Sequence, residues 1–177
     1  MDKENNKVQT KHRSYNTQRV VGVWFLYIGV IVVLSSVFAG DFIFHPYIFG
    51  VGFIVGYVTI FGLPVVNKKL AYGKNTKFQD NMDNLSIGLS LILMTLCGTL
   101  IGFENLRLLW LAVFTILGFH LMGFYFSQGP IVLLMGALVA TNGALGLSLS
   151  LVPFVLFAIV DGFLKIGFGI YMISRKR

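Results

Sequence analysis

Long apolar runs separated by short polar connections dominate the pattern along the 177-residue chain. A membrane-spanning helix needs about 20 mainly apolar residues. Strands of a membrane β-barrel would be about 10 residues long, with apolar and polar positions alternating. Six continuous runs have the length of spanning helices: residues 20–38, 46–66, 85–102, 107–126, 131–149 and 153–173. The pattern therefore predicts an all-α polytopic membrane protein with six transmembrane helices.

The connections between most of these runs are very short. Short turns place consecutive helices antiparallel, so we expect three antiparallel hairpins. Pro46, Pro130 and Pro153 stand where helices should begin, and a missing N–H is tolerated there. Pro64 lies near the end of the second run, where we expect it to bend the last turn.

Basic residues gather in three segments: a head (1–19), a loop (67–84) and a tail (174–177) hold twelve of the fourteen. Six spans put all three segments on one side of the membrane. The excess of lysine and arginine in cytoplasmic segments then predicts a multi-pass protein of the cell (inner) membrane with both termini in the cytoplasm. The polar head is expected to be disordered. Its partners should be anionic lipids at the cytoplasmic face rather than nucleic acid.

Composition excludes several classes of protein. Apolar residues make up 56% of the chain and charged residues 12%, against about 25% charged in soluble domains. No segment is long enough for a P-loop, Rossmann or DNA-binding domain, and Cys97 has no second cysteine for an intramolecular disulfide. A cleaved signal peptide is the competing interpretation of the first run. Because its apolar region should be only 7–15 residues long, we expect a retained span.

Asp161 and Lys165 are the charged residues inside the sixth run. They are four residues apart, on the same face of a helix. Counted from Pro153, they lie roughly 12 and 18 Å along the helix, near the centre of a core about 30 Å thick. Each charge costs about 2.5–3.5 kcal/mol there. The pair is either an ion, proton or substrate site or a structural ion pair, and Lys165 could also extend towards the interface.

Two further polar residues lie at comparable depth. His120 is roughly 9 Å from the cytoplasmic end of the fourth run, and Asn142 is near the middle of the fifth, where it could hydrogen-bond Asp161. With Asp161 and Lys165 they form a candidate midplane polar cluster if the helices meet. Ordinary packing hydrogen bonds are the alternative. We expect no metal and no cofactor, because no other histidine or cysteine completes a ligand set.

Glu104 and Arg107 form an outer rim beside a short turn. An exposed pair of this kind contributes little to stability. No serine–lysine, serine–histidine or paired-aspartate arrangement is evident at depth, so we expect no catalytic residues and no enzyme.

Glycines and phenylalanines recur in three of the runs. The motifs are Gly52-Phe53-x-x-Gly56-Tyr57, Gly118-Phe119-x-x-x-Gly123-Phe124 and Gly162-Phe163-x-x-x-Gly167-Phe168. Their spacing is compatible with three repeated hairpins. Small residues let helices approach closely, either within one chain or between the subunits of a homo-oligomer.

The basic head, the hairpins and these motifs together carry a resemblance. The chain resembles the small six-helix bacterial inner-membrane proteins of uncharacterised families. More loosely, it is similar to the acid-resistance membrane proteins with three glycine-rich hairpins. The first resemblance implies no known activity, and the second implies a stress-related membrane role. Two hypotheses follow: a small transporter or channel-like protein that uses the midplane cluster, and a non-transporting assembly or stress-protection protein.

Overall fold

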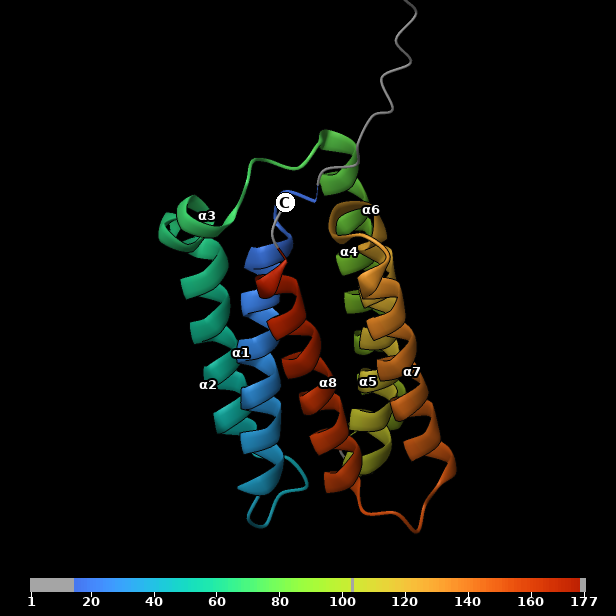
Figure 1. Ribbon diagram of the computed structural model, residues 1–177. Coiled ribbons are helices and arrows are strands. Elements are labelled where there is room, and N and C mark those ends of the chain that lie inside the picture. Colours follow the sequence, from blue (N-terminus) through green and yellow to red (C-terminus); the bar gives the residue numbers. More distant parts are fainter. Residues whose placement is uncertain (1–14, 103, 176–177) are drawn as a thin grey trace, which may run out of the picture.

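The computed structural model describes residues 15–102 and 104–175, which form helices and no strand (Figure 1). Most of the head expected to be disordered lies outside these residues, as do the last two residues of the tail. The helices are α1 (Gln18–Val37), α2 (Pro46–Tyr57), the π-helix η1 (Val58–Gly62), α3 (Pro64–Leu70), α4 (Lys77–Ile101), α5 (Leu106–Gly123), α6 (Tyr125–Gln128), α7 (Ile131–Ser148) and α8 (Phe154–Ser174).

Five of the described helices are long and apolar enough to cross a membrane: α1, α4, α5, α7 and α8. The second expected span is broken. Its first part, Pro46–Gly62, is followed after one residue by α3, which is bent away by 58°. At 1.5 Å per residue the first part is about 25 Å long, less than a core of about 30 Å. The helices are therefore compatible with five spans, or six if the bent pair counts as one.

Pro46, Pro130 and Pro153 stand at helix starts, as the sequence predicts, and Pro64, expected near the end of the second run, also begins a helix. Pro46 and Pro64 occupy first turns, and Pro130 and Pro153 precede α7 and α8. The expected bend at Pro64 is confirmed. Because proline cannot donate the helical hydrogen bond, the second helix is interrupted there.

The expected loop 67–84 is largely helical, which corrects its boundaries. Helix α3 continues to Leu70 and α4 already begins at Lys77. Thr76 and Gln79 explain the early start, because each side chain bonds the backbone N–H of the other. This reciprocal capping satisfies two donors that a helix start otherwise leaves open. It outweighs the polar composition from which a loop was expected.

The two most extensive helix contacts are that of α1 with α8, which are distant in sequence, and that of α5 with α7, which are separated by the short helix α6. Sequence neighbours also touch, with α1 on α2, α4 on α5 and α7 on α8. The start of α1, helix α3 and the end of α8 lie at one end of the bundle (Figure 1). We call this the basic end, because it carries Arg19, Lys68 and Arg175.

Glycine allows the close contact between α1 and α8. A Cβ atom on Gly29 would lie 2.6 Å from the carbonyl oxygen of Gly162, and one on Gly169 would lie 2.7 Å from that of Gly22. These contacts also show that the two helices run antiparallel. Backbones that touch in this way gain van der Waals contact even where lipid removes the hydrophobic driving force.

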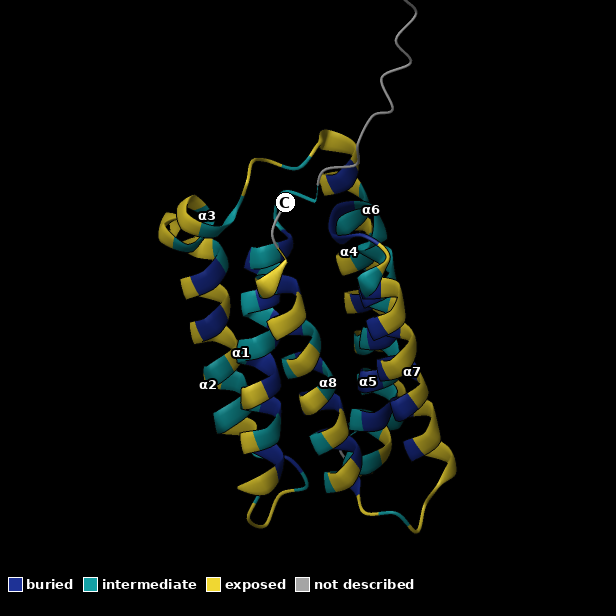
Figure 2. Cartoon of the chain, in the orientation of Figure 1, coloured by how far each residue is buried: buried dark blue, intermediate teal, exposed yellow. Residues whose placement is uncertain are grey.

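Buried residues line the contacts between helices, while exposed residues face outwards (Figure 2). One apolar cluster surrounds Phe25, Met135 and Met172, and a second surrounds Leu111 and Phe114. Helix α4 is the most exposed of the candidate spans, with 6% of its apolar window buried. An exposed helix that is apolar on all sides is typical of one surrounded by lipid.

Candidate functional site

Asp161 and Lys165 form a buried ion pair on α8. The Nζ atom of Lys165 donates a hydrogen bond to Oδ2 of Asp161. Asp161 is fully buried and Lys165 is 6% exposed. This ion pair is the one salt bridge within residues 15–102 and 104–175. The lysine therefore neutralises the carboxylate inside the bundle, instead of extending to either surface.

Helices α1 and α5 enclose this part of α8. Gly162, the residue after Asp161, packs on the backbone of Gly29 in α1. The ammonium group of Lys165 lies 5.7 Å from the ring centroid of Phe114 on α5. A cation over an aromatic face is attracted by the electron density of the ring. Phe114 thus gives the lysine a second stabilising contact.

One oxygen of the buried carboxylate has no hydrogen bond. Oδ1 of Asp161 lacks a hydrogen-bond partner in the described part of the chain. Leaving a buried acceptor unpaired costs about 1–3 kcal/mol, and more for a charged group. A proton or a small cation bound at this oxygen would offset that cost.

Asn142 lies one helical turn from the pair rather than on it. Its Nδ2 donates to the carbonyl oxygen of Phe157 at 2.9 Å, which joins α7 to α8. Asn142 is 8% exposed. In an α-helix the carbonyl of Phe157 also accepts the N–H of Asp161. Asn142 therefore fixes the turn of α8 that carries the aspartate without bonding its carboxylate.

His120 belongs to a different contact, between α5 and α4. Its Nδ1 lies 3.2 Å from Oγ of Ser86, and the same hydroxyl donates to the His120 carbonyl oxygen at 2.8 Å. The imidazole ring also packs edge-on against Phe124. The structure thus brings Asp161, Lys165 and Asn142 together, while His120 bonds another helix.

Arg107 does not pair with Glu104 in the outer rim. Its guanidinium donates to the carbonyl oxygens of Val152, Leu149 and Gly146, at 2.8, 3.0 and 3.1 Å. The last carbonyls of a helix have no partners within the helix, and they carry partial negative charge. Arg107 therefore holds the end of α7 and its turn into α8, a role with no signal in the local sequence.

A polar network at the basic end was not foreseen from the sequence. The side chain of Gln18 donates to the carbonyl oxygen of Gln128, and the Gln128 amide donates to Thr17 at 3.0 Å. Ser127 donates to Asp83 at 2.7 Å. The start of α1, the start of α4 and helix α6 are thereby joined. The only signal was that these polar residues border apolar runs.

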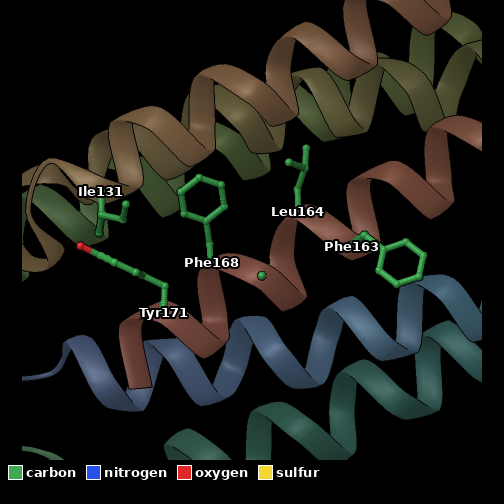
Figure 3. A pocket seen from close by; sticks show the side chains of 6 residues that line it. Ile131, Phe163, Leu164, Phe168 and Tyr171 are labelled. Atoms are coloured by element: carbon green, nitrogen blue, oxygen red, sulfur yellow. The ribbon is translucent and has the colours of Figure 1, made fainter. Parts of the chain in front are cut away.

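An apolar groove of about 280 Å³ runs along α8 on the outside of the bundle (Figure 3). The groove is bordered by the side chains of Phe163, Leu164, Phe168 and Tyr171 and by Ile131 of α7. Gly167, which has no side chain, also borders it. This groove fits lipid chains better than polar solutes. In addition, no three histidine, cysteine or acidic residues within the described ranges are close enough to hold a metal ion.

A family described as a family of unknown function (DUF6609) matches residues 7–177. The chain belongs to the DUF6609 family. Comparison with curated proteins and with solved structures gave no match. The expected membership of an uncharacterised family is confirmed, whereas the looser similarity to acid-resistance proteins stays a resemblance. Because the DUF6609 family carries no known activity, a function must be argued from the site itself.

Proposed function

We propose that this DUF6609 protein is a small transporter or channel-like protein of the cell membrane, with Asp161 as its ion or proton site. The proposal includes six spans, with the bent α2–η1–α3 segment as the second, and both termini in the cytoplasm. The observation that carries it is the fully buried Asp161 with one unpaired oxygen. Ionisable residues at this depth are rare and typically mark ion or proton pathways.

In this mechanism Lys165 and the transported ion are alternative partners of the Asp161 carboxylate. At rest the lysine neutralises the carboxylate. A proton or cation that reaches Oδ1 would weaken this ion pair and release the ammonium group towards the Phe114 ring. The positive charge of Lys165 then favours departure of the ion, which resets the site. Asn142 acts as a positioning residue, because it holds the preceding turn of α8.

The broken second helix supports the same proposal. A π-helix, an extended residue at Leu63 and a 58° bend follow each other between α2 and α3. Transporters often use interrupted helices of this kind, because the interruption frees backbone groups and permits movement. The break gives the first hairpin a place where it can change shape while α1 stays packed on α8.

Flux in reconstituted vesicles tests the proposal. The purified full chain is placed in proteoliposomes that contain a dye for protons, for sodium or for potassium, and an external acid pulse or a gradient of the matching cation is applied. We expect proton or cation entry above that of empty vesicles, and we expect Asp161→Asn to reduce it at least tenfold by removing the ionisable oxygen. Glu104→Gln is the matched control, because it makes the same chemical change at an exposed site and should leave the flux unchanged.

Two results would contradict this function: vesicles with the parent chain as tight as empty ones for all three ions, or equal flux in the Asp161→Asn protein. The first result would favour the second candidate, a non-transporting assembly or stress-protection protein. One observation favours that alternative: Lys165 and Asp161 lie on the same helix, in a pair that needs no mobile partner. The absence of enzymatic activity, a homo-oligomer and a lack of nucleic-acid binding remain predictions.

A further inference from the structure

A second site lies at the basic end, away from the Asp161 pair. An open pocket of about 530 Å³ is bordered by α3, by the connection from α3 to α4, by Thr17 just before α1, and by the first turn of α4. Its volume is in the range of small-molecule sites. The polar residues around it are Thr17, Asn67, Lys68, Lys74, Asn75 and Asp80. Four separate segments therefore contribute to one concave polar surface.

The chemistry of this pocket suits an anion. The residues that border the pocket include two lysines, Lys68 and Lys74, and one acidic residue, Asp80, so positive charge is in excess. Oδ1 of Asn75 accepts a hydrogen bond from the Thr17 hydroxyl at 3.1 Å. With its oxygen turned to Thr17, Asn75 also has an amide NH₂ group that can donate to a ligand. Phosphate oxygens accept hydrogen bonds from lysine ammonium groups and from amide N–H groups.

Apolar surface adjoins the basic side of the pocket. Val65 precedes Lys68 by three residues, so the two lie on the same face of α3. Val65 is 55% exposed, and Leu63, at the bend before α3, is 49% exposed. A ligand with its anion at Lys68 can therefore lay a hydrocarbon chain beside Val65. This arrangement fits an amphiphile better than a free anion.

The bend at Pro64 explains why the pocket lies at this level. By turning 58° from the preceding helix, α3 leaves the direction of α2 at the basic end of the bundle (Figure 1). A short helix of this kind, with basic and apolar residues, is suited to the headgroup region of a bilayer. Basic pockets at the ends of membrane helices are known settings for lipid phosphates.

We propose that this pocket binds the phosphate headgroup of an anionic phospholipid such as phosphatidylglycerol. Lys68 and Lys74 hold the phosphate oxygens, Asn75 donates to the headgroup, and one acyl chain runs along Val65. The site does not depend on the proposed transport function, because none of its residues contacts Asp161 or Lys165. Either proposal can therefore fail while the other stands.

The test is a titration of the purified full chain in detergent with short-chain phosphatidylglycerol or phosphatidylcholine, followed by thermal unfolding. A lipid that binds the folded state raises the unfolding temperature, and above its dissociation constant the stabilisation grows with the logarithm of the lipid concentration. We expect this rise with phosphatidylglycerol alone. Lys68→Gln with Lys74→Gln should weaken the apparent affinity roughly tenfold. The control, Lys69→Gln with Lys77→Gln, removes the same charge next to the pocket and should weaken it far less.

Equal loss in the two double variants would overturn the proposal, because net charge alone would then explain binding. Inorganic phosphate and glycerol phosphate form a second arm. If either raises the unfolding temperature of the parent as strongly as the lipid does, the pocket is a site for a soluble phosphate and the lipid assignment is wrong. The unfolding temperatures of the variants without lipid show whether they are folded.

Discussion

Asp161 is the residue at which the chain departs most from the needs of a lipid-embedded bundle. Apolar residues at positions 161 and 165 would remove the cost of desolvating two charges, and such replacements often stabilise proteins. The chain instead keeps a carboxylate whose Oδ1 atom has no partner within the described residues. Packing of Phe114 against Lys165 and the Asn142 bond to α8 stabilise the surroundings of the pair. An unpaired buried oxygen lowers stability, and it is the observation on which the proposed ion or proton site rests.

The first prediction concerns the two partners of this ion pair. Asp161→Asn and Lys165→Met should each lower the free energy of unfolding by about 3–5 kcal/mol, because each leaves a buried charge without its counter-charge. The double variant should recover most or all of this loss. Thermal unfolding of the four purified proteins in one detergent measures the effect. Similar unfolding temperatures for all four would show that water reaches the charges and that the pair is not buried.

At the scale of helices, glycines decide which elements can meet. The α1–α8 contact uses Gly22 and Gly29 on one side and Gly162 and Gly169 on the other. In each helix the two glycines are seven residues apart, which returns them to the same face after two turns. Small residues on α7 differ in their surroundings: Gly136 lies against α5, whereas Ala144 is exposed. The sequence motifs therefore locate small residues without showing which of them are in contact.

A pair of alanine substitutions on α8 tests this contact. A Cβ atom on Gly162 would lie 2.8 Å from the Gly29 carbonyl oxygen, so Gly162→Ala should destabilise the protein by about 1–3 kcal/mol. Gly167 has open space around it. Gly167→Ala should therefore be neutral or stabilise by up to about 1 kcal/mol, because alanine favours helix. Thermal unfolding in detergent measures both effects, and equal destabilisation would argue against a close α1–α8 contact.

At the scale of the whole molecule, the arrangement brings three basic segments to one end. The first turn of α1, helix α3 and the end of α8 gather there (Figure 1). This is the distribution that the positive-inside rule favours for a chain with an even number of spans. It depends on the bent second helix crossing the membrane, although its straight part is shorter than a typical bilayer core.

Cysteine labelling distinguishes six spans from five. In a Cys97→Ser background, Asp41→Cys, Lys77→Cys and Arg175→Cys are probed with a membrane-impermeant maleimide on intact cells. Six spans predict that position 41 is labelled and that positions 77 and 175 react only after permeabilisation. If the bent pair did not cross, an N-terminus in the cytoplasm would put all three positions outside. Labelling of all three in intact cells would therefore refute the proposed topology.

For the candidate site, the sequence indicated how far along its helix each polar residue lies, but not which side chains it contacts. The spacing of Asp161 and Lys165 already placed them on one helix face, because that relation is local. Whether His120 would join them depended on the rotation of α5, which turns its imidazole ring to Ser86 on α4. For the same reason, Arg107 bonds the end of α7 instead of Glu104.

By itself, the sequence determined the all-helical class, the approximate apolar segments and the bend at Pro64. Each of these follows from a local property: the length of an apolar run, the rise of a helix, or the missing N–H of proline. Only the tertiary structure decided that α1 lies along α8. Apolar helix faces look alike in sequence, so the sequence does not show which of them pack together. That choice depends on the matched shapes of residues far apart in the chain, such as Gly29 and Gly162, which are more than a hundred positions apart.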